Sequence, residues 1–174
     1  MVSVDSSDEK LATLADNVGQ TLQQRQLRVT TAESCTGGWI AKLFTDIAGS
    51  STWFERGFVT YSNESKQDML GVTSSVLHSY GAVSEETVIE MAKGALTHSQ
   101  ADVSVAISGI AGPGGGTPQK PIGLVWFAWA GTKAGKSMRT VVSRQQYFDG
   151  DRDAVRRQAV AYALMGILEQ LGDN

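Results

Sequence analysis

The sequence predicts an α/β fold: a single domain of three layers, with helices on both faces of one sheet. Helical and extended segments alternate along the chain, and two of the extended segments, 101–108 and 122–131, are apolar almost throughout. Such runs are typical of strands that helices cover on both sides. With 174 residues, 41% of them hydrophobic, the chain is long enough for one sizeable core and short enough for one domain, expected to span 1–174.

The first half of the chain predicts a helix and then a β-α-β unit. Apolar residues recur at helical spacing behind the acidic segment "SSDE" and predict an amphipathic helix that ends near Arg25: Leu11, Leu14, Ala15, Val18 and Leu22. The β-branched segment 27–32 predicts a strand, and the segment 56–62 predicts a second one. Between them, the segment 36–49 predicts a helix that Gly49 ends.

The second half predicts two helices and three strands. The segment 84–99 predicts a helix that Ser84 begins, with its apolar residues on one face: Val88, Met91, Ala92 and Leu96. The apolar segments 101–108 and 122–131 predict central strands, whereas the alternating segment 138–148 predicts an edge strand. A last helix is predicted from about Asp151, with a buried stripe: Val160, Leu164, Ile167 and Leu171. The sequence shows no internal repeat and no linker.

Composition and charge argue against several kinds of partner. The net charge is −3, and the 15 Lys and Arg residues are scattered, so we expect no nucleic-acid partner. A single cysteine cannot form an internal disulfide, and the acidic start "MVSVDSSDEK" does not have the pattern of a secretory signal, so we expect a cytoplasmic protein. No apolar run approaches the roughly 18 residues that span a bilayer, so we expect a soluble protein with no membrane partner.

Two adjacent candidate nucleophiles, Ser34 and Cys35, lie in the segment "TTAESCTGGW" between a predicted strand and a predicted helix. Unpaired N–H groups and the positive end of the helix dipole would stabilise an oxyanion there. If the strand continues through this pair, the two side chains point to opposite faces and only one of them can act. The plainer alternatives are that Ser34 or Thr36 caps the helix, and that Cys35 is a small buried hydrophobic residue.

A serine nucleophile needs a base, and the sequence offers few candidates. His78 and His98 lie in helical or post-helical segments away from the strand ends, which argues against a Ser-His-Asp triad. Tyr61 and Lys66 follow the second strand and would reach the same sheet edge as Ser34 if the two strands are parallel. Lysine can replace the histidine of a triad, but its pKa must then fall by about 3 units, through burial or a neighbouring cation. Otherwise, Lys66 is a solvated lysine and Tyr61 a core tyrosine.

The segment "SGIAGPGGGTPQKPIG" (108–123) interrupts the pattern between two predicted strands. Glycine occupies positions 109, 112, 114, 115 and 116, and the segment holds all three prolines of the chain. Glycines let a ligand approach bare backbone N–H groups and prolines restrict the loop, which suits an anion or a polar ligand. The spacing matches neither a P-loop nor a dinucleotide-binding fingerprint. A long connection that is merely glycine-rich is an equal alternative.

Several motifs together resemble the CinA C-terminal domain family, in particular its stand-alone nicotinamide-nucleotide amidases. They extend over nearly the whole chain: "TTAESCTGGWIAKLFTDIAGSS", "ERGFVTYSNESK", "GAVSEE", "SGIAGPGGG" with "KPIG", and "DGDRDAVRRQA". The resemblance implies a three-layer α/β/α sandwich with a mixed, mostly parallel sheet, assembled as a homo-oligomer, dimer or higher. It also implies that the chain hydrolyses nicotinamide mononucleotide (NMN) to nicotinate mononucleotide and ammonia in pyridine nucleotide salvage.

The resemblance further assigns residues to the site. It makes Ser34 the nucleophile, with Tyr61 and Lys66 as its activating partners. It places the glycine-rich loop at the substrate, with these residues: Ser108, Gly109, Ala111, Gly112 and Gly115. A second function class stays open, a non-catalytic nucleotide-binding or interaction domain of the CinA type. The presence of the serine, the tyrosine and the lysine favours the enzyme.

Deamidation of a carboxamide is acyl transfer, which needs neither a metal nor another cofactor. The developing oxyanion would be held by backbone N–H groups of the turn after the nucleophile: Cys35, Thr36 and Gly37. The substrate phosphate needs a cationic pocket, and Arg152 and Arg156 stand one turn apart at the start of the last helix. Salt bridges from these arginines to the acids of the segment 149–153, at positions 149, 151 and 153, are an equal alternative.

Overall fold

The computed structural model describes residues 4–132 and 139–172 of the chain. The helices in these residues, including one short 3-10 turn, have the following bounds: α1 Asp8–Arg25, α2 Trp39–Thr45, η1 Ser50–Thr52, α3 Asn63–Leu70, α4 Ser74–Tyr80, α5 Glu85–Thr97 and α6 Arg152–Leu171. The strands have these bounds: β1 Val29–Glu33, β2 Phe54–Val59, β3 Val103–Gly109, β4 Leu124–Thr132 and β5 Arg139–Tyr147.

The five described strands form one mixed sheet in the order β2-β1-β3-β4-β5. β1 pairs in parallel with both β2 and β3, whereas β4 is antiparallel to its neighbours β3 and β5. All the described strands except β4 therefore run in one direction, as the family resemblance implies. β5 lies at the edge, as predicted for the segment 138–148, although the first residue of that segment, Met138, lies outside the described residues.

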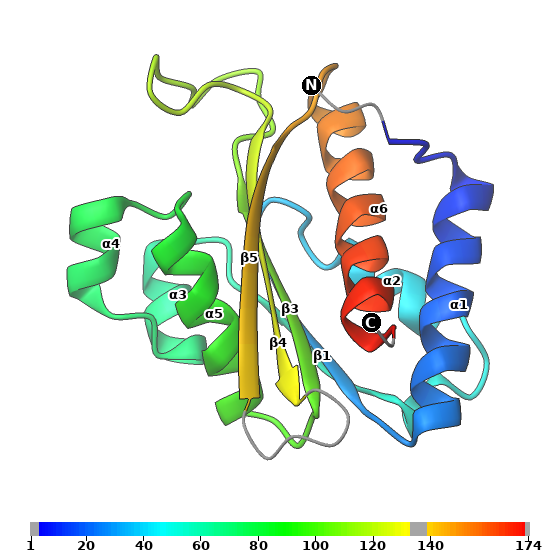
Figure 1. Cartoon of the computed structure of the whole chain (residues 1–174). Coiled ribbons are helices and arrows are strands. Elements are labelled where there is room, and N and C mark those ends of the chain that lie inside the picture. The colour runs from blue at the N-terminus through cyan, green and yellow to red at the C-terminus, as the bar shows by residue number, and fades with distance from the viewer. Residues whose placement is uncertain (1–3, 133–138, 173–174) are drawn as a thin grey trace.

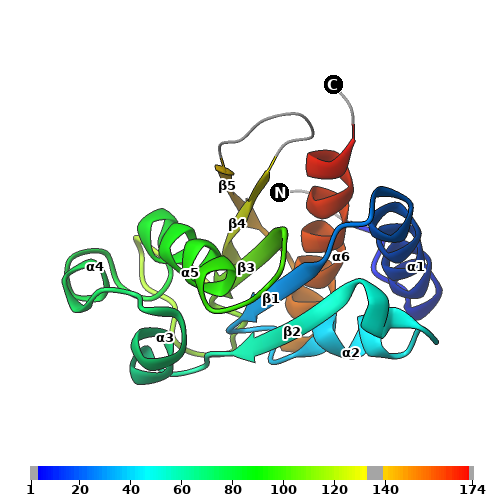
Figure 2. The same ribbon diagram turned by 90° about the horizontal axis from the view of Figure 1, so that it is seen from below.

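Helices cover both faces of the sheet and make the molecule a three-layer α/β/α sandwich. α1, α2 and α6 lie on one face, and α3, α4 and α5 lie on the other (Figure 1, Figure 2). Each face has its own apolar core. The three-layer prediction is confirmed. Every residue predicted for the buried faces of α1, α5 and α6 is also buried.

The prediction of a helix over 36–49 is wrong in its bounds, because α2 covers only Trp39–Thr45. Gly37 and Gly38 precede α2 with φ angles of 64° and 92°, a left-handed region that favours glycine and cannot belong to a right-handed helix. Gly49 does not end α2 either, since it adopts a φ of 81° at the start of η1. The residues before α2 therefore form a tight turn after β1 instead of a further turn of helix.

Two short helices, α3 and α4, are absent from the sequence prediction. Each presents only one or two residues to the interior, too few to show a helical period. Their ends carry the signals that were available: Ser62 accepts from the N–H of Ser65 in a capping box, Thr73 caps α4, and Gly71 ends α3 with a φ of 68°. α3 carries Lys66, which the sequence analysis places at the same sheet edge as Ser34.

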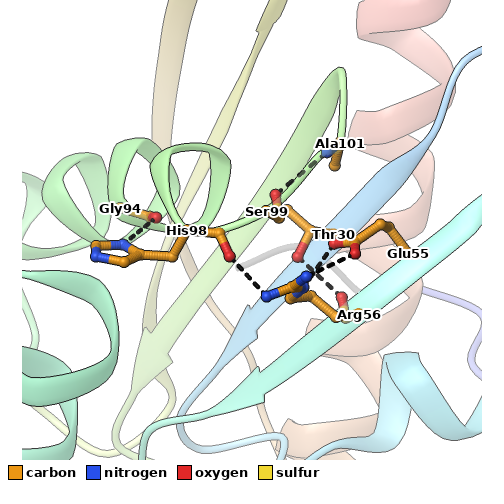
Figure 3. A network of polar contacts seen from close by, with 7 residues as sticks. All are labelled: Thr30, Glu55, Arg56, Gly94, His98, Ser99 and Ala101. Carbon is orange, nitrogen blue, oxygen red and sulfur yellow. Dashed lines mark hydrogen bonds and ion pairs between the residues drawn. The ribbon is translucent and has the colours of Figure 1, made fainter.

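A polar network at the amino end of β1 ties the edge strand β2 to the end of α5 (Figure 3). The guanidinium of Arg56 donates to both carboxylate oxygens of Glu55, at 2.7 and 2.8 Å, and to the carbonyl of His98 at 2.8 Å. The hydroxyl of Thr30 on β1 donates to the carbonyl of Arg56 at 2.8 Å. This network satisfies the carboxyl end of α5 and holds β2 on the sheet.

The connections next to β1 diverge at the opposite, carboxyl end of that strand. The crossover from β1 to β2 runs through α2 on one face, and the crossover from β2 to β3 runs through α3, α4 and α5 on the other (Figure 2). In open α/β sheets, ligands bind beyond the carboxyl ends of strands where the connections diverge in this way. None of the described helices combines the length and the apolar character needed to cross a bilayer.

Candidate active site

Ser34 is the first residue after β1 and lies at the carboxyl end of the sheet. Its N–H donates to the carbonyl of Ile107 on β3 at 3.0 Å, and the residue is 8% exposed. The alternative that Ser34 or Thr36 caps α2 is wrong. Gly38 occupies the cap position without a side-chain bond, and the buried hydroxyl of Thr36 has no partner among the described residues.

Lys66 is a buried cation in contact with Ser34. Its Nζ donates to Ser34 Oγ at 3.0 Å and to the carbonyl of Thr60 at 2.7 Å, and the residue is 1% exposed. Among the described residues no carboxylate pairs with this amine. Burial therefore lowers the pKa of Lys66 to about 8. The alternative of a solvated lysine is therefore wrong.

Cys35 belongs to the apolar core that α1, α2 and α6 cover. It is 6% exposed, and burial raises the pKa of its thiol to about 12. A thiol of that kind supplies almost no thiolate near neutral pH. The strand alternation expected through this pair does not hold, because β1 ends at Glu33. The two neighbours nevertheless have different surroundings, Lys66 for Ser34 and the apolar core for Cys35.

Glu33 is a site residue that the sequence analysis missed. Its fully buried carboxylate accepts from the N–H groups of Gly38 and Ile40 at 3.1 Å and of Ala41 at 2.9 Å. The carboxylate therefore fills the amino end of α2, where the helix dipole favours negative charge. These amides are not available to a substrate, which corrects the expectation of unpaired N–H groups there. The only signal in the sequence was an acidic residue directly before the turn.

Two amides of the turn remain without an oxygen acceptor. The N–H of Gly37, predicted to hold the oxyanion, donates to the carbonyl of Ser34 at 3.1 Å, and the N–H of Trp39 donates to Thr36 at 3.3 Å. The N–H groups of Cys35 and Thr36 donate to no oxygen atom of the described residues. They belong to the two residues directly after Ser34, and the residue after a nucleophilic serine is a usual source of an oxyanion donor.

Tyr61 and Arg152 meet at the rim of the site. Tyr61 is 63% exposed, so the alternative of a core tyrosine is wrong. Arg152 donates to the hydroxyl of Tyr61 at 3.0 Å and to the carbonyl of Gly112 at 2.7 Å. Within the described residues the hydroxyl of Tyr61 bonds neither Ser34 nor Lys66. The structure thus brings the predicted lysine onto the serine but joins the predicted tyrosine to an arginine.

Arg156, one turn further along α6, reaches the nucleophile turn instead. Its Nε donates to the carbonyl of Cys35 at 3.0 Å and its Nη2 to the carbonyl of Thr36 at 3.2 Å. Its guanidinium carbon lies 5.1 Å from the ring centroid of Trp39, a cation–π contact. In the described part of the chain, neither Arg152 nor Arg156 pairs with an acid of the segment 149–153, so the salt-bridge alternative is wrong for both.

The glycine-rich loop has a packed start and an exposed tip. Ser108 is 1% exposed and its hydroxyl donates to the carbonyl of Ala82 at 2.7 Å, while Ala111 belongs to a core. Residues 113–119, which include Gly115, are exposed. Gly109 ends β3. Of the loop residues predicted to bind substrate, Gly112 is the one that Arg152 links to the rest of the site.

Histidines and metal ligands do not gather at this site. His98 belongs to the network at the amino end of β1, and His78 is exposed on α4. Residues 4–132 and 139–172 contain no group of three or more His, Cys, Asp or Glu side chains placed to hold a metal ion.

Comparison with known proteins identifies the family. The CinA C-terminal domain family matches residues 11–171. The chain belongs to this family. A family member from Escherichia coli K12, named nicotinamide-nucleotide amidohydrolase PncC, is 58% identical over 168 residues, which are 97% of this chain and 99% of that protein.

Two further relatives are a longer protein that contains a similar segment and a protein with a crystal structure. A CinA-like protein of Akkermansia muciniphila is 53% identical over 148 residues, which cover 85% of this chain but 34% of that longer protein. The crystal structure of the competence/damage inducible protein CihA from Agrobacterium tumefaciens superposes with a TM-score of 0.87 at 43% identity, covering 92% of this chain and 95% of that one. The predicted family and its fold are therefore confirmed.

Proposed function

We propose that this chain is an NMN amidohydrolase that uses Ser34 as nucleophile and Lys66 as general base. The observation that carries the mechanism is the contact of 3.0 Å between Lys66 Nζ and Ser34 Oγ, made by a buried lysine that has no carboxylate partner among the described residues. The substrate follows from the relatives that match along their whole length and carry the name nicotinamide-nucleotide amidohydrolase. The non-catalytic alternative is not favoured.

The first half of the reaction acylates Ser34. Neutral Lys66 accepts the proton of the serine hydroxyl as Oγ attacks the carboxamide carbon of NMN. The bond to the carbonyl of Thr60 holds the amine in place for this transfer. The resulting oxyanion accepts hydrogen bonds from the N–H groups of Cys35 and Thr36. Protonated Lys66 then returns the proton to the leaving nitrogen, the C–N bond breaks, and ammonia departs.

The second half of the reaction releases the product. Water attacks the nicotinoyl ester on Ser34 and gives its proton to Lys66, which is neutral again after ammonia has left. The same two amides hold the second oxyanion, the ester C–O bond breaks, and Ser34 recovers its proton from Lys66. Atoms and charges balance with the described side chains and one water molecule, so the reaction as written uses no metal or other cofactor.

The nucleotide part of NMN would lie across the rim formed by Tyr61, Arg152 and the loop at Gly112. Arg152 is exposed and its partners are neutral, so its charge is available to a phosphate. Arg156 fits this role less well, because two of its nitrogens already bond the turn after Ser34. This proposal therefore assigns the phosphate to Arg152 and gives Tyr61 a substrate-binding position beside it.

Ammonia release from NMN by the purified protein in the presence of a chelator tests the function. We expect turnover that survives exhaustive chelation, and mass spectrometry of enzyme quenched during turnover should find a nicotinoyl adduct on the peptide containing "AESCTGG". Activity that disappears on chelation and returns with zinc or manganese would contradict the serine mechanism. A protein that binds NMN without releasing ammonia would instead support the non-catalytic alternative. A homo-oligomeric assembly, a cytoplasmic location and the absence of a nucleic-acid partner remain predictions from the sequence.

A further inference from the structure

We propose that Arg156 is a positioning residue that aims the Thr36 amide, one of the two oxyanion-binding amides of the turn after Ser34. This inference rests on the proposed function, since it concerns the oxyanion of that reaction. Arg156 makes its bonds to the carbonyls of Cys35 and Thr36, on the side of the turn away from the free amides. In the described structure it has no hydrogen bond to Ser34 or Lys66, so it would act through the backbone of the turn.

Peptide geometry connects Arg156 to the amide of Thr36. The carbonyl of Cys35 and the N–H of Thr36 belong to one trans peptide group, so they lie in one plane and point in opposite directions. The guanidinium holds that carbonyl at 3.0 Å and therefore directs the N–H of Thr36 away from itself. A charged donor also polarises the amide that it bonds, which makes the N–H at the other end a stronger donor.

The other amides of the turn explain why this control is needed. From Ser34 to Ala41, all N–H groups except those of Cys35 and Thr36 already have acceptors in the described structure. Glu33 fixes the end of the turn that leads into α2, through the N–H groups of Gly38, Ile40 and Ala41. Gly37 and Gly38 follow Thr36 at positive φ angles, and glycine restricts the backbone conformation less than other residues do. Arg156 fixes the start of the turn, through the carbonyls of Cys35 and Thr36.

Arg156 is itself held in place by α2. Its guanidinium packs on the ring of Trp39, at 5.1 Å, and Trp39 is the first residue of α2. Its neighbour Arg157 lies at the same 5.1 Å from that ring, but its polar partners are Asp8 and Asp153 and not the turn. The chain therefore contains a matched pair of arginines that share one aromatic contact and differ in their contact with the turn.

The test compares Arg156→Met with Arg157→Met in steady-state hydrolysis of NMN. We expect Arg156→Met to lower kcat by about 10- to 1,000-fold, the upper figure being the loss expected for one oxyanion donor, and to change KM by less than about 3-fold. The acid limb of the pH profile should stay where it is in the wild type, because Lys66 is untouched. Arg157→Met should keep kcat within about 3-fold. Thermal unfolding of both variants checks that they are folded.

Arg156→Lys provides a second variant if the methionine variant does not fold. Lysine keeps the charge but cannot bond both carbonyls with a planar fork, so we expect a kcat between those of the wild type and of Arg156→Met. Equal kcat losses in the two methionine variants would overturn the proposal, because the shared contact with Trp39 would then explain them. A loss expressed in KM alone would also overturn it, because Arg156 would then bind substrate.

Labelling of Ser34 by a fluorophosphonate separates this inference from the proposed function. Serine attack forms an O–P bond and expels fluoride, and a phosphonyl oxygen occupies the oxyanion position, so no NMN is required. We expect labelling to be slower in Arg156→Met than in Arg157→Met. If the wild type labels in this way but does not hydrolyse NMN, the proposed substrate is wrong and the role of Arg156 stands. If labelling is equally fast in both variants while NMN turnover is normal in the wild type, the role of Arg156 is wrong.

Discussion

The two ends of β1 carry two charged networks of opposite design. At the amino end, Arg56 pairs with Glu55 and caps α5, and the side chain of the arginine is 48% exposed (Figure 3). At the carboxyl end, Lys66 is 1% exposed, bonds a hydroxyl and a carbonyl, and has no carboxylate partner among the described residues. The carboxylate of Glu33, the residue before Ser34, accepts hydrogen bonds from the N–H groups of Gly38, Ile40 and Ala41.

The difference appears in the pKa of each cation. The hydrogen bond from Arg56 to Glu55 raises the pKa of the guanidinium, so this cation stays charged at every working pH. Burial lowers the pKa of Lys66 to about 8, which brings it into the range where an amine can accept a proton. The two cations therefore differ in their burial, in their pairing with a carboxylate and in the direction of their pKa shift. Substitutions of Ser34, Lys66, Arg152 and Arg56, with Cys35→Ala as a control, test this account from the largest expected effect to the smallest.

Ser34→Ala should have the largest effect, a fall in kcat of about 10,000-fold or more, because no oxygen nucleophile remains beside Lys66. NMN should still bind, since the rim at Arg152 is untouched. Ammonia release and calorimetric binding measure the two quantities. Cys35→Ala is the matched control, expected to keep kcat within a few-fold because the thiol lies in the core. A thiol-dependent adduct that persists in Ser34→Ala and vanishes in Cys35→Ala would reverse the assignment.

Lys66→Met should abolish turnover almost as completely, and Lys66→Arg should not restore it, since a guanidinium stays protonated.

The methionine variant should also be more stable at pH 7. Burial lowers the pKa of Lys66 in the folded state to about 8, below its ordinary 10.5. The buried protonated amine therefore lowers the free energy of unfolding below pH 8. This destabilisation decreases as the pH rises from 8 to 10.5. Urea unfolding at pH 7 should show a gain of up to about 3 kcal/mol, reduced by the lost bond to Thr60. A less stable methionine variant at pH 7 would show that burial of the amine is not unfavourable.

The prediction of this contact from the sequence succeeded for a geometric reason. Ser34 and Lys66 each follow one of two parallel strands, and parallel strands end at one edge of a sheet. The buried position of Glu33 was not predictable, because its carboxylate is buried by bonds to Gly38 and Ile40 that form only when α2 packs against β1. The contact of Arg156 with the turn after Ser34 was not predicted for a similar reason: the partners lie about 120 positions apart in the chain, and no local pattern encodes such a contact. Tyr61 was expected beside the serine, but residues after a strand can point along several directions once the ladder has ended.

Arg152→Met should have a moderate effect that falls on substrate binding. If Arg152 holds the phosphate, KM for NMN should rise by about 10- to 100-fold, while the dephosphorylated riboside should be affected little. The measurement is kcat/KM for both substrates with wild type and variant. Equal losses for the two substrates would mean that Arg152 only joins Tyr61 to the loop at Gly112.

Arg56→Ala should have the smallest effect on activity, because the side chain of Arg56 is 48% exposed and the candidate site lies at the other end of β1. We expect kcat and KM within about 2-fold of the wild type and a fall of at most about 3 °C in the unfolding midpoint. Scanning calorimetry and NMN kinetics check both values. A large loss of activity in this variant would remove the functional separation between the two ends of the strand.

The dependence of kcat/KM on pH in the wild type tests the central claim most directly, that a buried neutral lysine activates Ser34. The account predicts that kcat/KM rises about tenfold per pH unit at acid pH and levels off above an apparent pKa near 8, the value that burial gives Lys66. A profile that is flat from pH 6 to pH 9, or an acid limb that is unchanged in an active Lys66→Arg variant, would contradict it.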